Sequence, residues 1–385
     1  MEKSTFKMGT INKTWKIHDS TDWEILLPSF DWLQDMVGVK QDAIYHAEGD
    51  VANHTKMVLE ALLQLPEYVV LEEQQQAILV AAVLLHDVEK RSTTVIEEDG
   101  RITSKGHALK GSFTARKILY QEHATPFLVR EVIVKLVRYH GLPIWFLEKR
   151  HPAKAVIQAS LEVDTTLLYI LAKADMLGRI CKDQADMLDR VELFKEFCKE
   201  QDCFGQAKAF PSDWGRYLYF YKEDGSLEYV PYEKDSFEVI LLSGLPGTGK
   251  DAHIREHYKD VPMVSIGALR RQHKVLPTNK KKNGQMIQLA KEEARTHLRI
   301  KQPFVWNATN ITQNMRRQMI DLFQTYGAKT KLVYLEVPYK QLLKQNRNRE
   351  YMVPEKVIHR MIQKLEVPVV WEAPIVEYPN LLPQG

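Results

Sequence analysis

The spacing of hydrophobic and polar positions changes once along the chain. From residue 46 to about 203, apolar residues recur at intervals of three and four, which predicts amphipathic helices over 51–65, 73–85, 111–121, 126–140, 166–181 and 185–200. From residue 237 onward, short apolar runs at 239–243, 263–266, 304–306 and 331–335 alternate with helical patterns at 285–300, 314–326 and 339–348. Such alternation is typical of a parallel sheet covered by helices. We therefore expect an all-α domain followed by an α/β domain.

These patterns divide the chain into four parts. Residues 1–45 are expected to form an N-terminal extension carrying helix, 46–205 a helical domain, 206–236 a connector and 237–385 the α/β domain. Within the connector, partial alternation at 213–221, a turn signal at 223–226 and the short run 227–230 predict a β-hairpin. Its aromatic residues suit a structured connector, and the alternative is that they stack on bases.

Composition limits the compartments and the classes of partner that we expect for the protein. The 385 residues include 53 Lys and Arg against 50 Asp and Glu, so the net charge of +3 does not by itself indicate a nucleic-acid binder. The three cysteines, Cys181, Cys198 and Cys203, form no CxxC pair, which favours a reducing compartment. The polar N-terminal segment lacks the apolar core of a signal peptide, and the longest apolar run, 77–85, is too short to cross a bilayer. We expect a cytoplasmic protein with no membrane association.

A glycine-rich turn follows the apolar run 239–243 and precedes a helical stretch at 252–258. It consists of Gly244, Leu245, Pro246, Gly247, Thr248, Gly249, Lys250 and Asp251. Glycines let backbone N–H groups surround a phosphate chain, the helix N-terminus adds positive potential, and Lys250 can reach the β and γ phosphates. This P-loop pattern predicts a nucleoside triphosphate, ATP or GTP, bound with Mg²⁺. The alternative is a glycine-rich turn in an unrelated α/β fold.

The last residue of this turn departs from the usual P-loop pattern. Serine or threonine normally stands there to hold Mg²⁺, whereas this chain has Asp251. A carboxylate can bind Mg²⁺ directly or through water, but it also places negative charge beside the phosphates.

Side chains that bind metals are distributed through the helical half. An apolar helix ends at the adjacent pair His86 and Asp87, which can aim both side chains at one metal ion. Candidates to join them from neighbouring helices are His54, His107, His140 and Asp175. Imidazole and carboxylate ligands suit Mn²⁺, Co²⁺, Ni²⁺, Fe²⁺ or Zn²⁺ better than the all-oxygen shells of Mg²⁺ or Ca²⁺. A lone histidine in a helix is more often a core residue than a ligand, and His18, His123 and His151, which lack such a context, are expected at the surface.

The order of these residues and their local sequences resemble the HD superfamily of metal-dependent phosphohydrolases. The supporting stretches are HAEGDVANHT at 46–55, HDVEK at 86–90, GHALKG at 106–111, RYHG at 138–141 and ADM at 174–176. The resemblance implies that one divalent cation is bound by His54, His86, Asp87 and Asp175. It also suggests a second ion held by His107 and His140, with Asp87 as the bridge. Such ions activate water near neutral pH and neutralise a phosphoester, and Lys90 would add positive charge near that phosphate.

The region after the P-loop resembles the P-loop phosphotransferases, and among them the polynucleotide 5′-hydroxyl kinases. The supporting stretches are VSIGALRR at 264–271, WNATN at 306–310 and a lid-like segment at 347–358. The resemblance implies that Arg347 and Arg349 clamp the triphosphate and that Arg270 holds a phosphate of the acceptor strand. It also implies that the turn at 307–310 shapes the acceptor pocket.

One position departs from that family. Its second strand ends in an aspartate that takes the proton from the attacking hydroxyl, whereas this chain has Gly267 there. A general base typically contributes roughly 10²–10⁴-fold in rate, so we expect an impaired kinase unless another carboxylate substitutes. We expect Asp251 on the metal side of the nucleotide and do not assign it as that base.

A basic stretch follows the second predicted strand and suits phosphate neutralisation, although such a run also fits a solvated loop. It contains Arg270, Arg271, His273, Lys274, Lys280, Lys281 and Lys282.

Taken together, residues 46–370 resemble the bacterial bifunctional end-healing enzymes that join an HD domain to a polynucleotide kinase. The resemblance implies that the helical domain removes a 2′,3′-cyclic, 2′- or 3′-phosphate from RNA or DNA strand ends. The kinase would phosphorylate the 5′-hydroxyl, which prepares both ends for a ligase. Two alternatives remain open: a nucleotidase joined to a small-molecule kinase, and a P-loop module that senses NTP and regulates the hydrolase.

Overall fold

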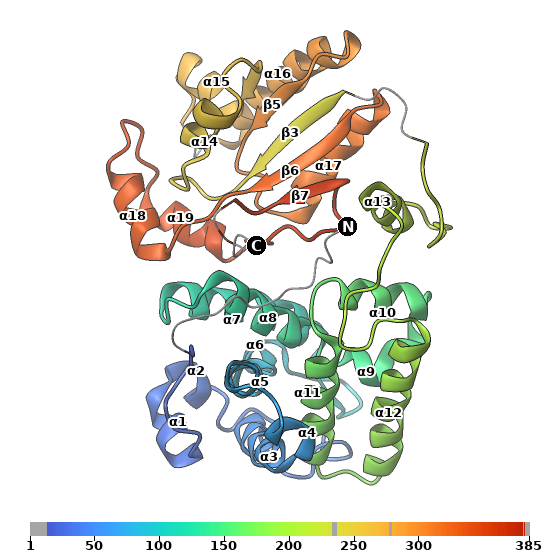
Figure 1. The fold of residues 1–385 in the computed structure, drawn as a ribbon. Helices are drawn as coiled ribbons and strands as arrows, with labels where there is room; N and C mark the ends of the chain where they lie inside the picture. Colours follow the sequence, from blue (N-terminus) through green and yellow to red (C-terminus); the bar gives the residue numbers. More distant parts are fainter. Residues whose placement is uncertain (1–13, 233–236, 277–278, 380, 382–385) are drawn as a thin grey trace. The chain divides into compact units, whose positions relative to one another are not determined.

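The computed structural model describes residues 14–232, 237–276, 279–379 and 381. The chain folds into two compact units that divide between Ala209 and Phe210 (Figure 1). The first is helical and the second is an α/β unit with a parallel sheet, so the predicted fold class is confirmed.

The N-terminal unit is built from helices and one small hairpin. Its longer helices are α3 (Val51–Gln64), α5 (Glu73–Leu85), α7 (His107–Gln121), α8 (Phe127–Tyr139), α10 (Pro152–Ser160), α11 (Thr165–Leu177) and α12 (Gln184–Glu200). Shorter ones are α1 (Trp23–Ser29), α2 (Asp31–Gln34), α4 (Pro66–Val69), α6 (Lys90–Thr93), α9 (Leu142–Trp145) and the 3₁₀ turn η1 (Phe146–Glu148). Strands β1 (Val95–Ile96) and β2 (Ile102–Thr103) form an antiparallel pair that the predicted pattern did not include.

Helix α5 is the centre of this unit (Figure 1). Every residue from Ile78 to Leu85 is buried, because this helix is apolar all round and packs against α3, α8 and α11. The segment before α3 joins the same core through Ile17, Trp23, Leu26, Phe30 and Trp32. The buried helix thus holds its C-terminal end, where His86 and Asp87 lie, in a fixed place among its neighbours.

The predicted hairpin of the connector is wrong. Residues Asp213–Tyr221 form helix α13, which begins where the Ser212 hydroxyl accepts a hydrogen bond from Gly215 N at 2.9 Å. Trp214, Tyr217, Leu218 and Tyr221 recur at helical spacing, and Tyr217 and Leu218 are buried in the core of the C-terminal unit. The partial alternation of apolar and polar residues at 213–221 therefore reflects the apolar face of a helix and not a strand.

The C-terminal unit contains a five-stranded parallel sheet in the order β4-β5-β3-β6-β7 (Figure 1). The strands are β3 (Glu238–Ser243), β4 (Met263–Ser265), β5 (Phe304–Asn307), β6 (Lys329–Tyr334) and β7 (Ile375–Glu377). The helices are α14 (Lys250–His257), α15 (Ile266–Gln272), α16 (Lys280–Arg299), α17 (Gln313–Thr325), α18 (Tyr339–Arg347) and α19 (Glu355–Ile362). Strand β7 and helix α15 were not predicted.

Alternate residues of β3 enter two different cores. Leu241 packs with Trp306, Leu332 and residues of α16 and α17, whereas Leu242 packs with Ile254 of α14 on the other face. In register, Leu241 lies beside both Trp306 of β5 and Leu332 of β6. A central strand buried on both faces explains the continuous apolar run before the P-loop.

No single described helix is long and apolar enough to cross a membrane; α10 and α11 meet the length and hydropathy criteria only as a pair, bent by 110°.

Candidate functional sites

Three helices bring the predicted ligands of the first metal ion together in the N-terminal unit. His54 comes from α3, His86 and Asp87 from the end of α5, and Asp175 from α11. His54 Nε2 lies 3.1 Å from Asp175 Oδ1 and 3.7 Å from Asp87 Oδ2, and His86 Nε2 lies 3.2 Å from the same Asp87 oxygen. One donor atom each from His54, His86 and Asp175 falls within 4.8 Å of the others.

Asp87 also belongs to a second group of donors. Its Oδ1 lies 3.4 Å from His107 Nε2 and 3.9 Å from His140 Nε2, and these two ring nitrogens are 3.2 Å apart. His107 begins α7, and His140 follows α8. The two carboxylate oxygens of Asp87 therefore face different histidines, which is the arrangement a bridging ligand requires.

Backbone carbonyls orient three of these imidazoles. Nδ1 of His86, His107 and His140 lies 2.7, 2.7 and 2.9 Å from the carbonyl oxygen three residues earlier. A carbonyl only accepts hydrogen bonds, so the ring proton sits on Nδ1 and the Nε2 lone pair is left to bind a metal.

Within the described part of the chain, several of these donor atoms are buried without a hydrogen-bond partner, as expected for atoms that bind a cation. Among the described residues, both ring nitrogens of His54, His86 Nε2 and Asp87 Oδ1 are buried without a hydrogen-bond partner, although His54 Nδ1 lies in ion-pair contact with Glu48. Buried polar atoms are rarely left unpaired, because each one costs free energy. Imidazole and carboxylate donors in this arrangement fit a divalent transition metal.

Neighbouring charges keep the carboxylates ionised. Burial opposes ionisation of Asp87, but Lys90 and the His86 ring hold its pKa well below its usual range. For Asp175, burial is likewise outweighed by Arg179 and His54, so its pKa is also well below its usual range. Burial, together with the nearby rings of His107 and His86, lowers the pKa of His140 to about 3. The site therefore presents anionic carboxylates and a neutral imidazole at pH 7, the forms that bind metals.

Two cations contact the metal-ligand carboxylates. Lys90 Nζ, which is buried, lies 2.8 Å from Asp87 Oδ2 and donates to Gln41 Oε1 at 2.7 Å. Arg179 Nη2 lies 3.0 Å from Asp175 Oδ1, one helical turn further along the chain. Lys90 was predicted near the phosphate. Arg179 was not predicted, although its i+4 spacing from Asp175 was a usable signal.

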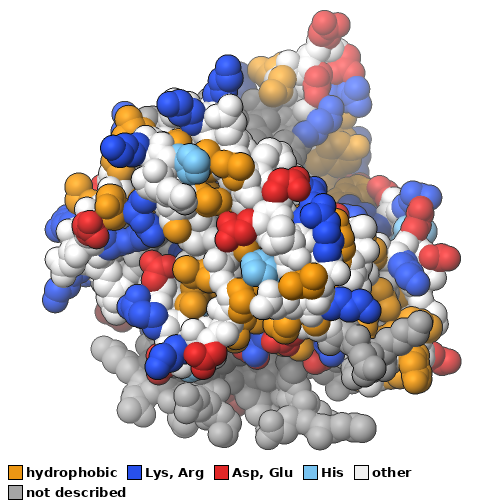
Figure 2. Space-filling model, turned by 90° about the horizontal axis from the view of Figure 1, so that it is seen from above, with side chains coloured by type: hydrophobic (Ala, Val, Ile, Leu, Met, Phe, Trp, Pro, Cys, Tyr) orange, Lys and Arg blue, Asp and Glu red, His pale blue; other side chains and the backbone are white. Residues whose placement is uncertain are grey.

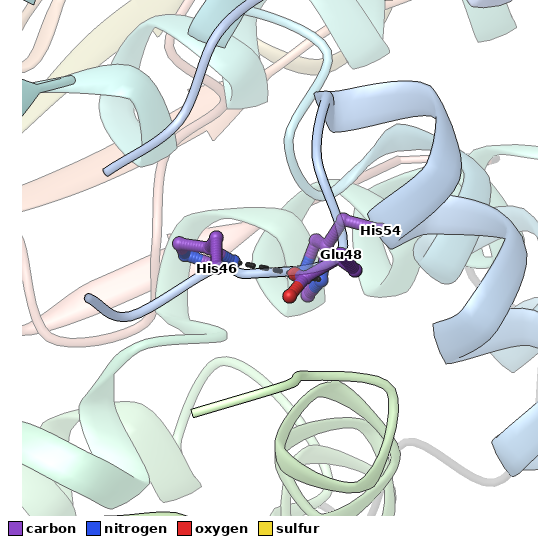
Figure 3. Close-up of side chains that lie close together, drawn as sticks. All are labelled: His46, Glu48 and His54. Atoms are coloured by element: carbon purple, nitrogen blue, oxygen red, sulfur yellow. Dashed lines mark hydrogen bonds and ion pairs between the residues drawn. The ribbon is translucent and has the colours of Figure 1, made fainter. Parts of the chain in front are cut away.

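A third group, His46, Glu48 and His54, adjoins the metal ligands (Figure 3). Glu48 Oε1 lies 2.7 Å from His46 Nδ1 and 2.9 Å from His54 Nδ1. Burial works against the charge, but the two ring N–H groups hold the pKa of Glu48 well below its usual value. His46 and Glu48 lie in the stretch that carries the HD resemblance, and neither was assigned a role from the sequence.

The P-loop of the C-terminal unit has the backbone that its glycines predict. Gly244, Gly247 and Gly249 have φ of +148°, +92° and +89°. A Cβ atom on Gly244 would lie 2.4 Å from the carbonyl oxygen of Leu335, so no larger residue fits there. Lys250 Nζ donates to the carbonyl oxygens of Gly244 and Leu245 at 2.8 and 2.7 Å. Burial lowers the pKa of Lys250 to about 7, and nearby Arg349 works in the same direction against the attraction of Asp251.

Asp251 is held by the neighbouring strand. Its Oδ1 accepts a hydrogen bond from Asn307 Nδ2 at 2.7 Å, and Asn307 is the last residue of β5. Both side chains lie at the carboxyl ends of the strands, where ligands bind in open α/β sheets.

A cavity of about 1240 Å³ opens beside the P-loop. The described residues that line it include seven cations and two carboxylates, the latter being Asp251 and Glu350. The cations are Lys250, Arg255, Arg270, Arg271, Lys274, Lys291 and Arg349. The face drawn in Figure 2 mixes basic and acidic side chains, whereas cations predominate in the lining of this cavity. A polyanion such as a triphosphate or a nucleic-acid strand fits such a lining.

Several predicted kinase residues line this cavity. Arg270 Nε is buried without a hydrogen-bond partner among the described residues, and burial lowers the pKa of Arg270. Arg349 also lines it, whereas Arg347 pairs with Glu355 at 2.8 Å. Gly267 lies at the cavity wall in the first turn of α15. Of the rest of the basic stretch, Arg271 and Lys274 line the cavity, Lys281 and Lys282 lie in the first turn of α16, and the side chain of Lys280 lies outside the described residues.

The lid-like segment is held at its base by one buried side chain. Asn346 Nδ2 donates to the carbonyl oxygen of Val353 at 2.7 Å, and its Oδ1 accepts from Val353 N at 3.1 Å. These two bonds close the loop between α18 and α19, which presents Arg349 to the cavity.

Residues 239–368 match the family model described as AAA domain. This part of the chain is a P-loop kinase-like domain. The match begins at β3 and ends after α19, so it includes the P-loop, Asn307 and the lid-like segment. The match supports nucleotide binding and a kinase-like role for the C-terminal unit, and it is consistent with NTP and Mg²⁺ as ligands.

Proposed function

We propose that this protein is a bifunctional end-healing enzyme for RNA or DNA strands. The N-terminal unit removes a 2′,3′-cyclic, 2′- or 3′-phosphate, and the C-terminal unit transfers a phosphoryl group from NTP to a 5′-hydroxyl. The observation that carries the proposal is the division of Asp87 between two groups of histidines beside Lys90. A carboxylate shared by two groups of metal donors suits phosphoester hydrolysis by one or two divalent ions.

In the N-terminal unit, the metal-binding side chains would hold a cation beside Asp87, and Lys90 contacts the same carboxylate. The divalent ion supplies Lewis-acid chemistry, lowering the pKa of a water molecule and offsetting charge on the phosphoester. His54, His86, Asp87 and Asp175 hold the first ion, and His107 and His140 suit a second. Lys90 and Arg179 neutralise the carboxylates and place positive charge beside the substrate phosphate.

In the C-terminal unit, the cavity residues orient the two reactants. The P-loop N–H groups and Lys250 hold the triphosphate, Asp251 and Asn307 lie where Mg²⁺ is expected, and Arg349 reaches from the lid. Arg270, whose Nε has no partner among the described residues, is placed for a phosphate of the acceptor strand. Gly267 supplies no base, so phosphorylation is expected to be slow.

Because Gly267 supplies no base, a second function remains a candidate for the C-terminal unit. An NTP-sensing P-loop unit that regulates the hydrolase would need the phosphate-binding groups but no proton acceptor. Tight NTP binding without turnover, coupled to a changed rate of phosphate removal, distinguishes it.

An oligonucleotide with a 5′-hydroxyl and a 2′,3′-cyclic phosphate tests the proposal when both ends are scored separately with NTP, Mg²⁺ and Mn²⁺ present. We expect phosphate loss at the 3′ end and weak phosphorylation at the 5′ end. Change at neither end would contradict end healing, and salt-insensitive turnover of small nucleotides alone would favour the small-molecule pair. The proposal places the protein in the cytoplasm, acting ahead of a ligase.

A further inference from the structure

Glu48 is a buried carboxylate whose two oxygens have different partners. Its side chain is fully buried in the loop before α3. Oε1 lies 2.7 Å from His46 Nδ1 and 2.9 Å from His54 Nδ1. Figure 3 draws these three side chains. Oε2 accepts a hydrogen bond from Ile180 N at 3.0 Å.

His54 differs from the other predicted metal-binding histidines in the group that lies beside its Nδ1. His86, His107 and His140 lie at helix ends, where the carbonyl oxygen three residues earlier lies within hydrogen-bond distance of Nδ1. His54 lies inside α3, and the carbonyl three residues earlier, Val51 O, accepts from the Thr55 hydroxyl at 2.8 Å and from the helix backbone. The contact that a backbone carbonyl makes with Nδ1 of the other three histidines is made with His54 by the carboxylate of Glu48.

We propose that Glu48 is a positioning residue for metal binding, because it fixes the proton of His54 on Nδ1 and turns Nε2 toward Asp87 and Asp175. His54 Nδ1 lies 2.9 Å from Glu48 Oε1, and this ion-pair contact requires the ring proton on Nδ1 once a cation takes the lone pair of Nε2. His54 Nε2 then offers its lone pair 3.1 Å from Asp175 Oδ1. The inference rests on the metal centre of the proposed function.

The Glu48 carboxylate also links the segments next to α3 and α11, the helices that carry His54 and Asp175. Ala47 N donates to Ile180 O at 2.9 Å, and Ile180 N donates back to Glu48 Oε2. Residues 47–48 lead into α3, which carries His54, and Ile180 follows α11, which carries Asp175. Glu48 therefore fixes both the tautomer of one ligand and the spacing between two of them.

The substitution Glu48→Gln separates these contacts with almost no change in shape. A glutamine has one acceptor oxygen and one donor nitrogen, so its nitrogen must face either the Ile180 N–H or the two ring N–H groups. One set of contacts is lost in either orientation. Partners that orient metal ligands typically contribute 10–100-fold in metal affinity.

Asp50→Ala is a matched structural control. Asp50 begins α3 by accepting from Asn53 N at 2.8 Å and Gly38 N at 2.7 Å, and no contact to a metal ligand is described for its side chain. Losing such a helix cap lowers the stability of the fold. This variant should therefore melt at a lower temperature without altering the orientation of His54.

The test is a titration of the full-length metal-free proteins with Co²⁺ alone, followed by visible absorption, with the melting temperature measured in parallel. We expect Glu48→Gln to bind Co²⁺ about 10–100-fold more weakly at one site and with a changed spectrum. Asp50→Ala should keep the affinity and spectrum of the unsubstituted protein. Unchanged Co²⁺ binding in Glu48→Gln, or equal weakening in both variants, would overturn the role of Glu48. Absence of Co²⁺ binding by the unsubstituted protein would instead overturn the metal centre and this role with it.

Discussion

Lys90 Nζ lies 2.8 Å from Asp87 Oδ2, the carboxylate that faces both groups of histidines. A buried ammonium in this place neutralises excess negative charge and is available to a phosphate beside the ions. Removing one such preorganised donor typically costs roughly 10²–10³-fold in kcat. We expect Lys90→Gln to lower phosphate release from a 2′,3′-cyclic end by about that factor while metal content, measured by mass spectrometry, is retained.

Lys173→Gln is the matched control for that substitution. Lys173 lies on α11 near Asp175 but pairs with Glu67 at 2.6 Å. Its loss should leave phosphate release nearly unchanged. Equal effects of the two substitutions would contradict a specific role for Lys90.

Asp87 and His140 should differ in the number of ions that they control. Because the two oxygens of Asp87 face different histidines, Asp87→Asn should weaken both ions, whereas His140→Gln should weaken only the one shared with His107. We expect about two Co²⁺ per chain in the unsubstituted protein, one in His140→Gln and fewer than one in Asp87→Asn. Identical stoichiometry in the two variants would rule out the bridging arrangement.

Nucleotide binding should take up a proton through Lys250. Its pKa of about 7 lies below the usual value of 10.5, so much of the free protein carries neutral Lys250 at pH 8. A bound triphosphate favours the charged form, and binding at pH 8 should consume about 0.9 proton per site. Calorimetry with a non-hydrolysable ATP analogue in two buffers of different ionisation enthalpy measures this uptake.

Lys250→Met should abolish that proton uptake. The lowered pKa of Lys250 also affects folding. Between pH 7 and 10.5 the unfolded chain holds more protons at this position than the folded chain does. The contribution of Lys250 to the free energy of unfolding therefore rises with pH across that window. Proton uptake that persists in Lys250→Met would assign it to another group.

Gly267→Asp should strengthen the kinase. A Cβ atom at this position would lie 3.6 Å from Arg271 Nη1 and 3.7 Å from Ser265 Oγ, which are ordinary contacts, so an aspartate fits at the cavity wall. We expect 5′ phosphorylation to rise by roughly 10²–10⁴-fold, the usual contribution of a general base. Gly267→Asn is the control of equal size, and an equal gain in both would show that proton removal is not the missing step.

Much of the fold was predictable because long helices and buried strands have distinct periods. The helices around His54 and Asp175 and strands β3 to β6 were predicted to within a few residues. Short elements such as β7 and α15 carry too few residues for a period, and α13 was misread because aromatic residues at helical spacing also alternate in part.

The candidate metal site was predictable only as a set of residues. Local sequence contexts selected His86, Asp87 and their partners, but no pattern in one sequence says which oxygen of Asp87 faces which ring. The roles of Glu48 and Arg179 depend on contacts across the fold, so they emerged only with the structure.

The most direct test compares Asp87→Ala and Lys250→Met on one oligonucleotide that has a 5′-hydroxyl and a 2′,3′-cyclic phosphate. The account predicts that Asp87→Ala loses phosphate removal at the 3′ end by at least about 10³-fold while NTP binding is unchanged. Lys250→Met should lose NTP binding and the residual 5′ phosphorylation while 3′ activity is kept. Full 3′ activity in Asp87→Ala, or its loss in Lys250→Met, would contradict two separate active sites in this chain.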